Sequence, residues 1–433
     1  MSFTSSSFVP RWSDVYISGV ARAIDNGGDM LAAVALSLVL VQRGFGGVAV
    51  SALLLAAAVP PMLLAPISGR IADRLDSRHI LVVVGLIQVG ICVALAYATS
   101  IVAIVGLVAA LATGMAFTSP TFSALTPAMV GRDNLAKAAG IMQTASMIGS
   151  LLAPIAGGLL VGAFGAHIPL LIDAGTCLAI PAAGLLLRTR RCGGVANSEP
   201  AEAAGSAVTS GPAWSIWRDD LVRPLVILFA AVVAAVTAVN VVEVFFVRHT
   251  LHASTTFYGV LSALWLGGML IGTALVARMK PDDARSARLL FALLGGTGVI
   301  IALAGLVPHA LWMVPLWVLG GMTNGGENVL TSVLIGRRAP AATRGHAFAT
   351  FGGVMNAATA IGLGAGGLLL SIASPREIVF GTGIAGLLAL IPFTAPLLRA
   401  ARRERALADA AAAAAATPAP AVAPAAAVAS VGA

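Results

Sequence analysis

Residues 69–98 read GRIADRLDSRH, a charged segment, followed by ILVVVGLIQVGICVALAYA, in which Gln88 is the one strongly polar side chain. About 20 consecutive apolar residues are enough for a helix to cross the hydrocarbon core of a membrane. The same succession of short charged segments and long apolar ones continues on both sides of this stretch. Open sheet edges cannot exist in lipid, and unbroken apolar runs are not the alternating pattern of a β-barrel. The sequence therefore predicts an all-α integral membrane protein.

The composition of the whole chain agrees with a location in lipid. Of its 433 residues, 58% are hydrophobic and 10% are charged, whereas a soluble globular protein carries about 25% charged residues. The three cysteines, Cys92, Cys177 and Cys192, show neither the pattern of a disulfide framework nor metal-ligand spacing. We therefore expect no enzymatic activity, no cofactor, no bound metal and no nucleic-acid partner.

Twelve apolar stretches are long enough to cross the bilayer, and they fall into two groups of six. The first group comprises 17–42, 48–69, 80–98, 101–124, 138–162 and 167–187, and the second comprises 224–248, 256–278, 287–306, 311–335, 346–372 and 377–398. We expect residues 1–188 and 223–400 to form two six-helix bundles. Residues 189–222 between them are rich in Gly, Ala, Ser and Pro and should form a flexible linker. Residues 401–433 are rich in Ala and Pro and should form a disordered tail.

The positions of the basic residues predict the orientation of the chain. With twelve spans, every Lys and Arg among the 26 falls on the side of the two termini, except Arg22 inside the first span and Arg43, Arg248 and Arg376 on the other side. Cytoplasmic loops carry an excess of Lys and Arg. Both termini, the linker and the tail should therefore be cytoplasmic.

Five carboxylates fall inside the predicted spans: Asp25, Asp29, Asp173, Glu243 and Glu327. An ionised carboxylate at mid-bilayer costs on the order of 2.5 kcal/mol or more, so it is kept mainly where it has a partner or a water-filled cavity. Loss of water also favours its protonated form, which lets it take up and release a proton. Because a proton-driven transporter requires this chemistry, we select Asp29, Glu327, Glu243 and Asp25 as proton-coupling candidates.

Arg22, Asp25 and Asp29 are spaced by three and four residues, so they share one face of the first span. An ion pair between Arg22 and Asp25 at the end of the helix is the alternative interpretation of that pair. For Glu243 the alternative is an interfacial position, and for Asp173 it is a solvated helix end.

The segment after the second span, Gly69-Arg-Ile-Ala-Asp73-Arg74-Leu-Asp76-Ser-Arg78, resembles the G-x-x-x-D-[RK]-x-G-[RK]-[RK] loop of the major facilitator superfamily. Gly69, Asp73, Arg74 and Arg78 match, whereas Asp76 and Ser77 depart from the pattern. The resemblance implies that Asp73 helps to lock the two halves together on the cytoplasmic side when the cavity faces outward.

A second motif, in the fifth span, contains Gly149, Pro154, Gly157 and Gly158. It resembles the G-x-x-x-G-P-x-x-G-G signature of exporters of the same superfamily, with Ala153 in place of one Gly. Small residues allow helices to approach closely, and proline bends a helix by removing a backbone hydrogen bond. The resemblance implies a gating role for these residues and for Arg22, and it favours export over uptake.

Within this superfamily, the chain resembles the subfamily of bacterial exporters that includes enterobactin (siderophore) and macrolide efflux proteins. The matching residues are Arg22 with Gly28-Asp29, Val59-Pro60-Pro61, Gly69 with Asp73-Arg74, Val239-Asn240, and Phe246-Val247-Arg248. This resemblance implies the bacterial cytoplasmic (inner) membrane and two pseudo-symmetric six-helix bundles with a cavity between them, lined by spans 1, 4, 7 and 10.

The cavity wall is expected to be apolar and adaptable. Its predicted substrate-binding residues are Met115, Phe117, Phe122, Phe245, Phe246, Met322 and Asn324. We expect a monomeric secondary transporter that exports a small amphipathic molecule, such as a drug or siderophore, in exchange for protons. The alternatives are a proton-coupled uptake symporter and a non-transporting receptor or subunit of the same fold.

Overall fold

The computed structural model describes residues 10–131, 134–189, 214–279, 282–340 and 343–416, and these are helical with no strand. The first half contains α1 (Trp12–Gln42), α2 (Gly47–Arg74), α3 (Ser77–Tyr97), α4 (Ile101–Val130), α5 (Leu135–Phe164), α6 (His167–Cys177) and α7 (Ala179–Leu186). The second half contains η2 (Ile216–Arg218), α8 (Val222–Val236), α9 (Val239–Phe245), η3 (Phe246–Thr250), α10 (Thr255–Met279), α11 (Asp283–Leu306), η4 (Ala310–Trp312), α12 (Met313–Arg338), α13 (Arg344–Leu369) and α14 (Pro375–Ala416).

Twelve helical segments of the described chain match the twelve predicted spans. Eleven of them are long and apolar enough to cross a membrane. The twelfth is α12, which has 26 residues but includes the polar sequence Thr-Asn-Gly-Gly-Glu-Asn. The predicted all-α membrane fold is therefore confirmed.

Two of the spans are interrupted helices. The sixth consists of α6 and α7, which separate at Leu178, where the backbone N–H bonds to Gly175 three residues back. Pro181 has no N–H to donate to Cys177, the carbonyl four residues earlier, so one helical hydrogen bond is missing there. The seventh consists of α8, α9 and the π-helical turn η3.

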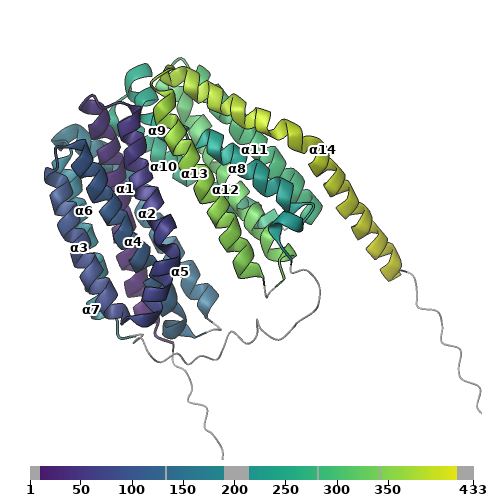
Figure 1. Ribbon diagram of the computed structural model, residues 1–433, viewed down its shortest axis with the longest axis horizontal. Helices are drawn as coiled ribbons and strands as arrows, with labels where there is room; N and C mark the ends of the chain where they lie inside the picture. The colour runs from purple at the N-terminus through teal and green to yellow at the C-terminus, as the bar shows by residue number, and fades with distance from the viewer. Residues whose placement is uncertain (1–9, 132–133, 190–213, 280–281, 341–342, 417–433) are drawn as a thin grey trace, which may run out of the picture.

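The two halves pair their helices in the same order. In the first half α1 packs on α5, α2 on α4 and α3 on α6; in the second, α8 and α9 pack on α13, α10 on α12 and α11 on α14. Counting the six spans of each half, the first pairs with the fifth, the second with the fourth and the third with the sixth. This repetition confirms two pseudo-symmetric six-helix bundles, which Figure 1 shows side by side.

The bundles touch along two seams, α5 with α10 and α2 with α13. Gly158 of α5 lies against the backbone of Thr255, and the hydroxyl of Ser51 on α2 donates to the carbonyl of Leu363 on α13. In Figure 1 the bundles meet toward the top and diverge toward the bottom of the view.

Two predicted boundaries need correction. The predicted tail begins at residue 401, but α14 continues to Ala416. The Ala, Leu, Arg and Glu residues there are strong helix formers, and the first proline of the tail is Pro418. The predicted linker 189–222 ends in the ordered turn η2 rather than in a flexible segment. The predictions for 190–213 and 417–433 lie outside the described residues.

Candidate functional site

A cavity of ≈ 490 Å³ lies between the two bundles. The first bundle contributes side chains of α1, α2 and α5, including Met30, Ser37 and Pro154, and the second contributes side chains of α8 to α13. Of the predicted lining spans, 1, 7 and 10 contribute and span 4, which is α4, does not. Most of the wall is apolar, and its aromatic residues are Phe229, Tyr258, Trp265 and Trp317.

Glu243 of α9 lines this cavity, and a pair of tryptophans holds its carboxylate in place. The indole Nε1 of Trp317 donates to Glu243 Oε1 at 3.0 Å. Trp317 is itself buried and packs edge-on against Trp265, with the ring centroids 6.0 Å apart. The carboxylate therefore has a fixed position at the wall rather than a free one at the membrane interface.

Glu327 of α12 is the second acid of the cavity, and its side chain is buried. Thr297 Oγ1 of α11 donates to Glu327 Oε1 at 2.6 Å and lies 2.7 Å from Thr323 Oγ1. The glycines that precede Glu327 let α12 approach α10 closely: an added Cβ at Gly325 would contact the carbonyl of Met269.

The two carboxylates have hydrogen-bond donors but no cationic partner among the residues that the structure describes. The described residues that line the cavity include no Lys or Arg, and the ion pairs of the described chain do not include Glu243 or Glu327. A buried charge without a partner is costly. A proton or a positively charged solute would remove this cost, so the cavity suits an ion-coupled process.

The predicted candidates Asp25 and Asp29 lie in the first bundle and do not line the cavity, although Met30 does. Asp25 is buried, and Asp29 Oδ2 is buried without a hydrogen-bond partner among the described residues. Arg22 lies near Asp25, and its guanidinium carbon is 5.9 Å from the centre of the Phe122 ring. The proton-coupling roles of all four acids stay predictions.

The predicted substrate-binding residues separate in the structure. Asn324 lines the cavity, whereas Met115, Phe117, Phe122, Phe245, Phe246 and Met322 are not among its lining residues. Phe122, Phe245 and Phe246 are buried in the helix cores instead. The residues that the sequence reasoning missed are Trp265, Trp317, Tyr258 and Thr297. The polar stretch of α12 around Glu327 was the available signal for a site on that helix.

The fifth-span motif lies between the bundles. An added Cβ at Gly149 would contact the carbonyl of Ala23 on α1, and one at Gly157 would lie 3.2 Å from the carbonyl oxygen of Leu31 on α1. Gly158 and Pro154 face α10 at Thr255 and Gly259, and Pro154 also lines the cavity. The motif thus packs α5 against its own bundle on one side and against the other bundle on the opposite side.

The loop motif connects α2 to α3. Gly69, Asp73 and Arg74 belong to the last turns of α2, and the side chains of Asp73 and Arg74 lie outside the described residues. Asp76, which replaces the glycine of the superfamily pattern, caps α3 by accepting from the backbone N–H of Arg78 at 2.8 Å. The departure from the pattern therefore supplies a helix cap.

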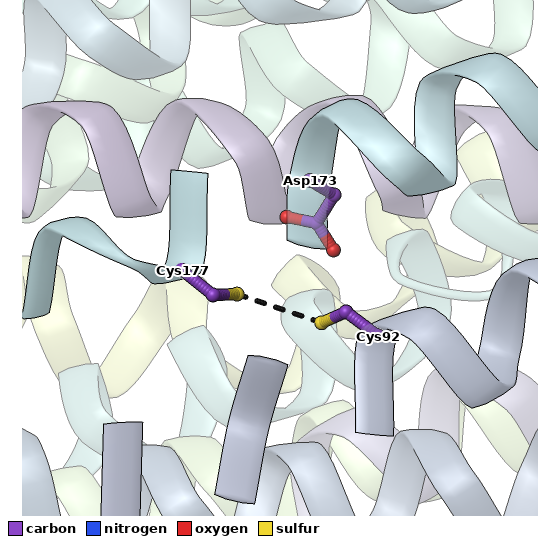
Figure 2. Close-up of side chains that lie close together, drawn as sticks. All are labelled: Cys92, Asp173 and Cys177. Atoms are coloured by element: carbon purple, nitrogen blue, oxygen red, sulfur yellow. Dashed lines mark hydrogen bonds between the residues drawn. The ribbon is translucent and has the colours of Figure 1, made fainter. Parts of the chain in front are cut away.

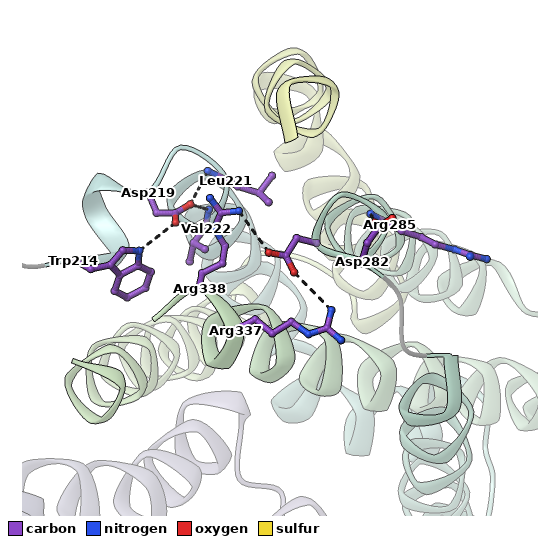
Figure 3. A network of polar contacts seen from close by, with 9 residues as sticks. Trp214, Asp219, Leu221, Val222, Asp282, Arg285, Arg337 and Arg338 are labelled. Atoms are coloured by element: carbon purple, nitrogen blue, oxygen red, sulfur yellow. Dashed lines mark hydrogen bonds and ion pairs between the residues drawn. The ribbon is translucent and has the colours of Figure 1, made fainter. Parts of the chain in front are cut away.

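A polar network joins η2, α8, α11 and α12 at one end of the second bundle (Figure 3). Asp219 accepts from Arg338 Nε at 2.8 Å and from the N–H groups of Leu221 and Val222 at 3.0 and 2.9 Å. Arg338 also pairs with Asp283 at 3.6 Å. Burial alone would raise the pKa of Asp219, but the bonds from Arg338 and the two N–H groups outweigh it, so its pKa lies below the ordinary value.

Two bundles of like topology around a central cavity define a multi-pass membrane transporter fold. Similar solved structures include a peptide transporter in complex with alafosfalin (16% identity, 92% of this chain and 96% of that chain, TM-score 0.71). A nucleoside transporter is 13% identical over 89% of this chain and 99% of that one, with a TM-score of 0.72. A bacterial homologue of the iron transporter ferroportin is 17% identical over 90% and 99%, with a TM-score of 0.67. At these identities the likeness shows the fold alone.

The sequence profile of the Major Facilitator Superfamily matches residues 19–314 and 249–431. The chain therefore belongs to the major facilitator superfamily, and is a transporter rather than an enzyme. No curated protein matches the sequence.

Proposed function

We propose that this chain is a secondary active transporter that exports a small amphipathic organic molecule in exchange for protons by alternating access. It works as a monomer in a bacterial cytoplasmic membrane and draws on the proton gradient instead of a cofactor. Glu243 and Glu327 carry the proposal, because they place two carboxylates without a cationic partner among the described residues at the wall of a cavity between the bundles.

The lining supports an amphipathic cargo. Trp265, Trp317, Tyr258 and Phe229 supply apolar and aromatic surface, which binds flat or hydrophobic groups and attracts positive charge to the ring faces. Asn240 and Asn324 add amide groups that can orient a polar part of the cargo.

Protons and cargo compete for the same carboxylates, and this competition couples the movement of one to the movement of the other. A proton that enters from outside neutralises a carboxylate, which lowers the cost of closing the cavity around it. The bundles then reorient, the proton leaves toward the cytoplasm, and the ionised site accepts cargo. A membrane potential of 100 mV adds about 2.3 kcal/mol for each charge moved.

The test begins with a thermal-shift screen of cationic, neutral and anionic amphipathic compounds against the purified full chain. Hits are then assayed in everted vesicles with an imposed proton gradient, acid inside. Antiport predicts accumulation of the hit together with dissipation of the gradient. Glu243→Gln and Glu327→Gln should still bind the hit, but should neither accumulate it nor dissipate the gradient when it is added.

The matched control is Glu377→Gln. Glu377 is also a glutamate of the second bundle, but it lies exposed at the start of α14, where it accepts from Ser374. This variant should transport like the wild type. Wild-type coupling in a Glu243→Gln/Glu327→Gln double variant would contradict the proposal.

The same assay separates the alternatives. An uptake symporter would move the hit and protons in the same direction, and a receptor or subunit would move neither. Gly158 and Pro154 of the fifth-span motif contact α10, so the motif lies where the bundles would move against each other. Its resemblance to the exporter signature favours export over uptake.

A further inference from the structure

A cluster of side chains that could ligate a metal ion lies inside the first bundle, away from the cavity. Cys92 of α3 faces Asp173 and Cys177 of α6 (Figure 2). The two Sγ atoms are 3.5 Å apart, and each lies within 4.8 Å of a carboxylate oxygen of Asp173. All three residues are at most 1% exposed, and none of them lines the cavity.

Local sequence brings these ligands together on two paired helices. Asp173 and Cys177 are four residues apart on α6, so they share one face. Cys92 approaches from α3, the helix that packs on α6. Leu111 and Ala174 surround the thiols with apolar side chains. The three side chains are therefore buried among apolar side chains on two packed helices.

Asp173 has an unused buried oxygen in this cluster. Its Oδ1 lies 3.4 Å from the hydroxyl of Thr176, but its Oδ2 is buried with no hydrogen-bond partner among the described residues. Buried acceptors of this kind are costly unless something binds them. Asp25 and Asp29 of α1 lie close enough to interact with Asp173. Arg22, the nearby cation of this bundle, lies beside Asp25. A cation is therefore the ligand that fits.

The two thiols form a hydrogen bond in the structure, and their spacing is also compatible with one class of cation. With Zn–S bonds of about 2.3 Å, two sulfurs of a tetrahedral zinc site lie about 3.8 Å apart, close to the observed 3.5 Å. A disulfide bond would require about 2.05 Å. Two soft thiolates favour Zn²⁺ over Mg²⁺ or Ca²⁺, and Zn²⁺ also accepts a carboxylate oxygen as a third ligand.

We propose that Cys92, Cys177 and Asp173 bind a thiophilic divalent metal ion of the Zn²⁺ class within the first bundle. Both thiols lose a proton to solvent on binding, and no electron transfer is involved. The ion joins α3 to α6 and leaves a fourth position open. This site is separate from the transport cavity, so the inference does not rest on the proposed function.

The test uses Co²⁺ as a spectroscopic substitute for Zn²⁺. The untagged, full-length chain is reduced in detergent, freed of reductant without air, and titrated with Co²⁺. We expect a thiolate-to-cobalt charge-transfer band that saturates at one ion per chain and disappears when an equivalent of Zn²⁺ is added. No band in the reduced wild type would overturn the proposal whatever the variants do.

Variants then locate the site, with folding checked by gel filtration. Cys92→Ala and Cys177→Ala should each abolish the band. Cys192→Ala removes the third cysteine and is the matched control, which should keep the band. Loss of the band in Cys192→Ala, or its survival in Cys92→Ala, would overturn the assignment. So would a chain that forms a Cys92–Cys177 disulfide in air but binds no Co²⁺ when reduced.

Discussion

Replacement of Gly158 by alanine tests whether α5 and α10 form a moving seam. In the structure, the added Cβ would lie 2.5 Å from the carbonyl oxygen of Thr255 and 3.2 Å from the Cα atom of Thr256. Both are backbone atoms that cannot rotate away, so the helices must separate. Overpacking of this kind costs about 1–3 kcal/mol. The cost applies only to the conformation in which α5 and α10 touch at this point.

Gly158→Ala should therefore shift the equilibrium between conformations about 5- to 150-fold toward the one in which these helices are apart, since about 1.4 kcal/mol is a factor of ten. Pulsed EPR between one spin label on each bundle measures the populations, and vesicle transport measures the consequence. Gly140→Ala on the same helix is the control, because nothing lies within 4 Å of its added Cβ. Both variants gain about 0.5–1 kcal/mol of helix stability. Equal distance distributions in the two variants would refute the reasoning.

Two further predictions concern buried hydrogen bonds. Asp219→Ala should lower the free energy of unfolding by about 2.5–4 kcal/mol, because it removes the bond from Arg338, about 1.5–3 kcal/mol, and the bonds from the N–H groups of Leu221 and Val222 at the start of α8, about 1 kcal/mol. Asp282→Ala removes only the exposed cap of α11 and should cost about 1 kcal/mol. Because the pKa of Asp219 is lowered, its ionised carboxylate should contribute fully to stability above the ordinary Asp pKa of about 3.9. This contribution should be lost as the pH falls through the lowered pKa. A stability difference between the wild type and Asp219→Ala that grows in acid would contradict this. Thr297→Val removes the donor to Glu327 and should cost about 1–3 kcal/mol, whereas Thr331→Val, which loses only a bond to a helix carbonyl, should cost less. Denaturant unfolding in micelles, followed by tryptophan fluorescence, measures all four variants.

The fold was predictable because hydropathy and charge act over whole spans. The expected span 80–98 corresponds to α3, Ser77–Tyr97, and the other spans before the last agree with their helices to within six residues at each end. A helix must extend until its backbone leaves the lipid, so length and apolar content suffice to find it. The end of α14 was missed because it lies beyond the apolar run, where helix propensity rather than burial keeps the helix going.

The site was predictable only in part. Glu243 and Glu327 were found because charge at bilayer depth is rare. Their donors, Trp317 and Thr297, come from other helices, and no local pattern relates them to these acids. The aromatic wall was not found because a helix that is apolar on all sides carries no signal for which face meets the cavity. Phe246, for example, is fully buried in the core. The Cys92–Cys177 contact could not be predicted either, because 85 residues separate the two thiols and no local sequence pattern relates them.

The acids of the two bundles differ in their access to the cavity, and this difference predicts different mutant behaviour. Glu243 lines the cavity, so it can exchange a proton with the cavity contents without a helix movement. Asp29 does not line it, although the next residue of α1, Met30, does. We expect a route to Asp29 to open when α1 moves against α5, which it contacts at Gly149. Glu243→Gln should change the equilibrium affinity for a cationic hit, whereas Asp29→Asn should leave that affinity unchanged, retain folding and lose proton-driven efflux. Isothermal titration paired with vesicle transport separates the two effects. An Asp29→Asn variant with undiminished efflux, or with the same loss of affinity as Glu243→Gln, would exclude this division of roles.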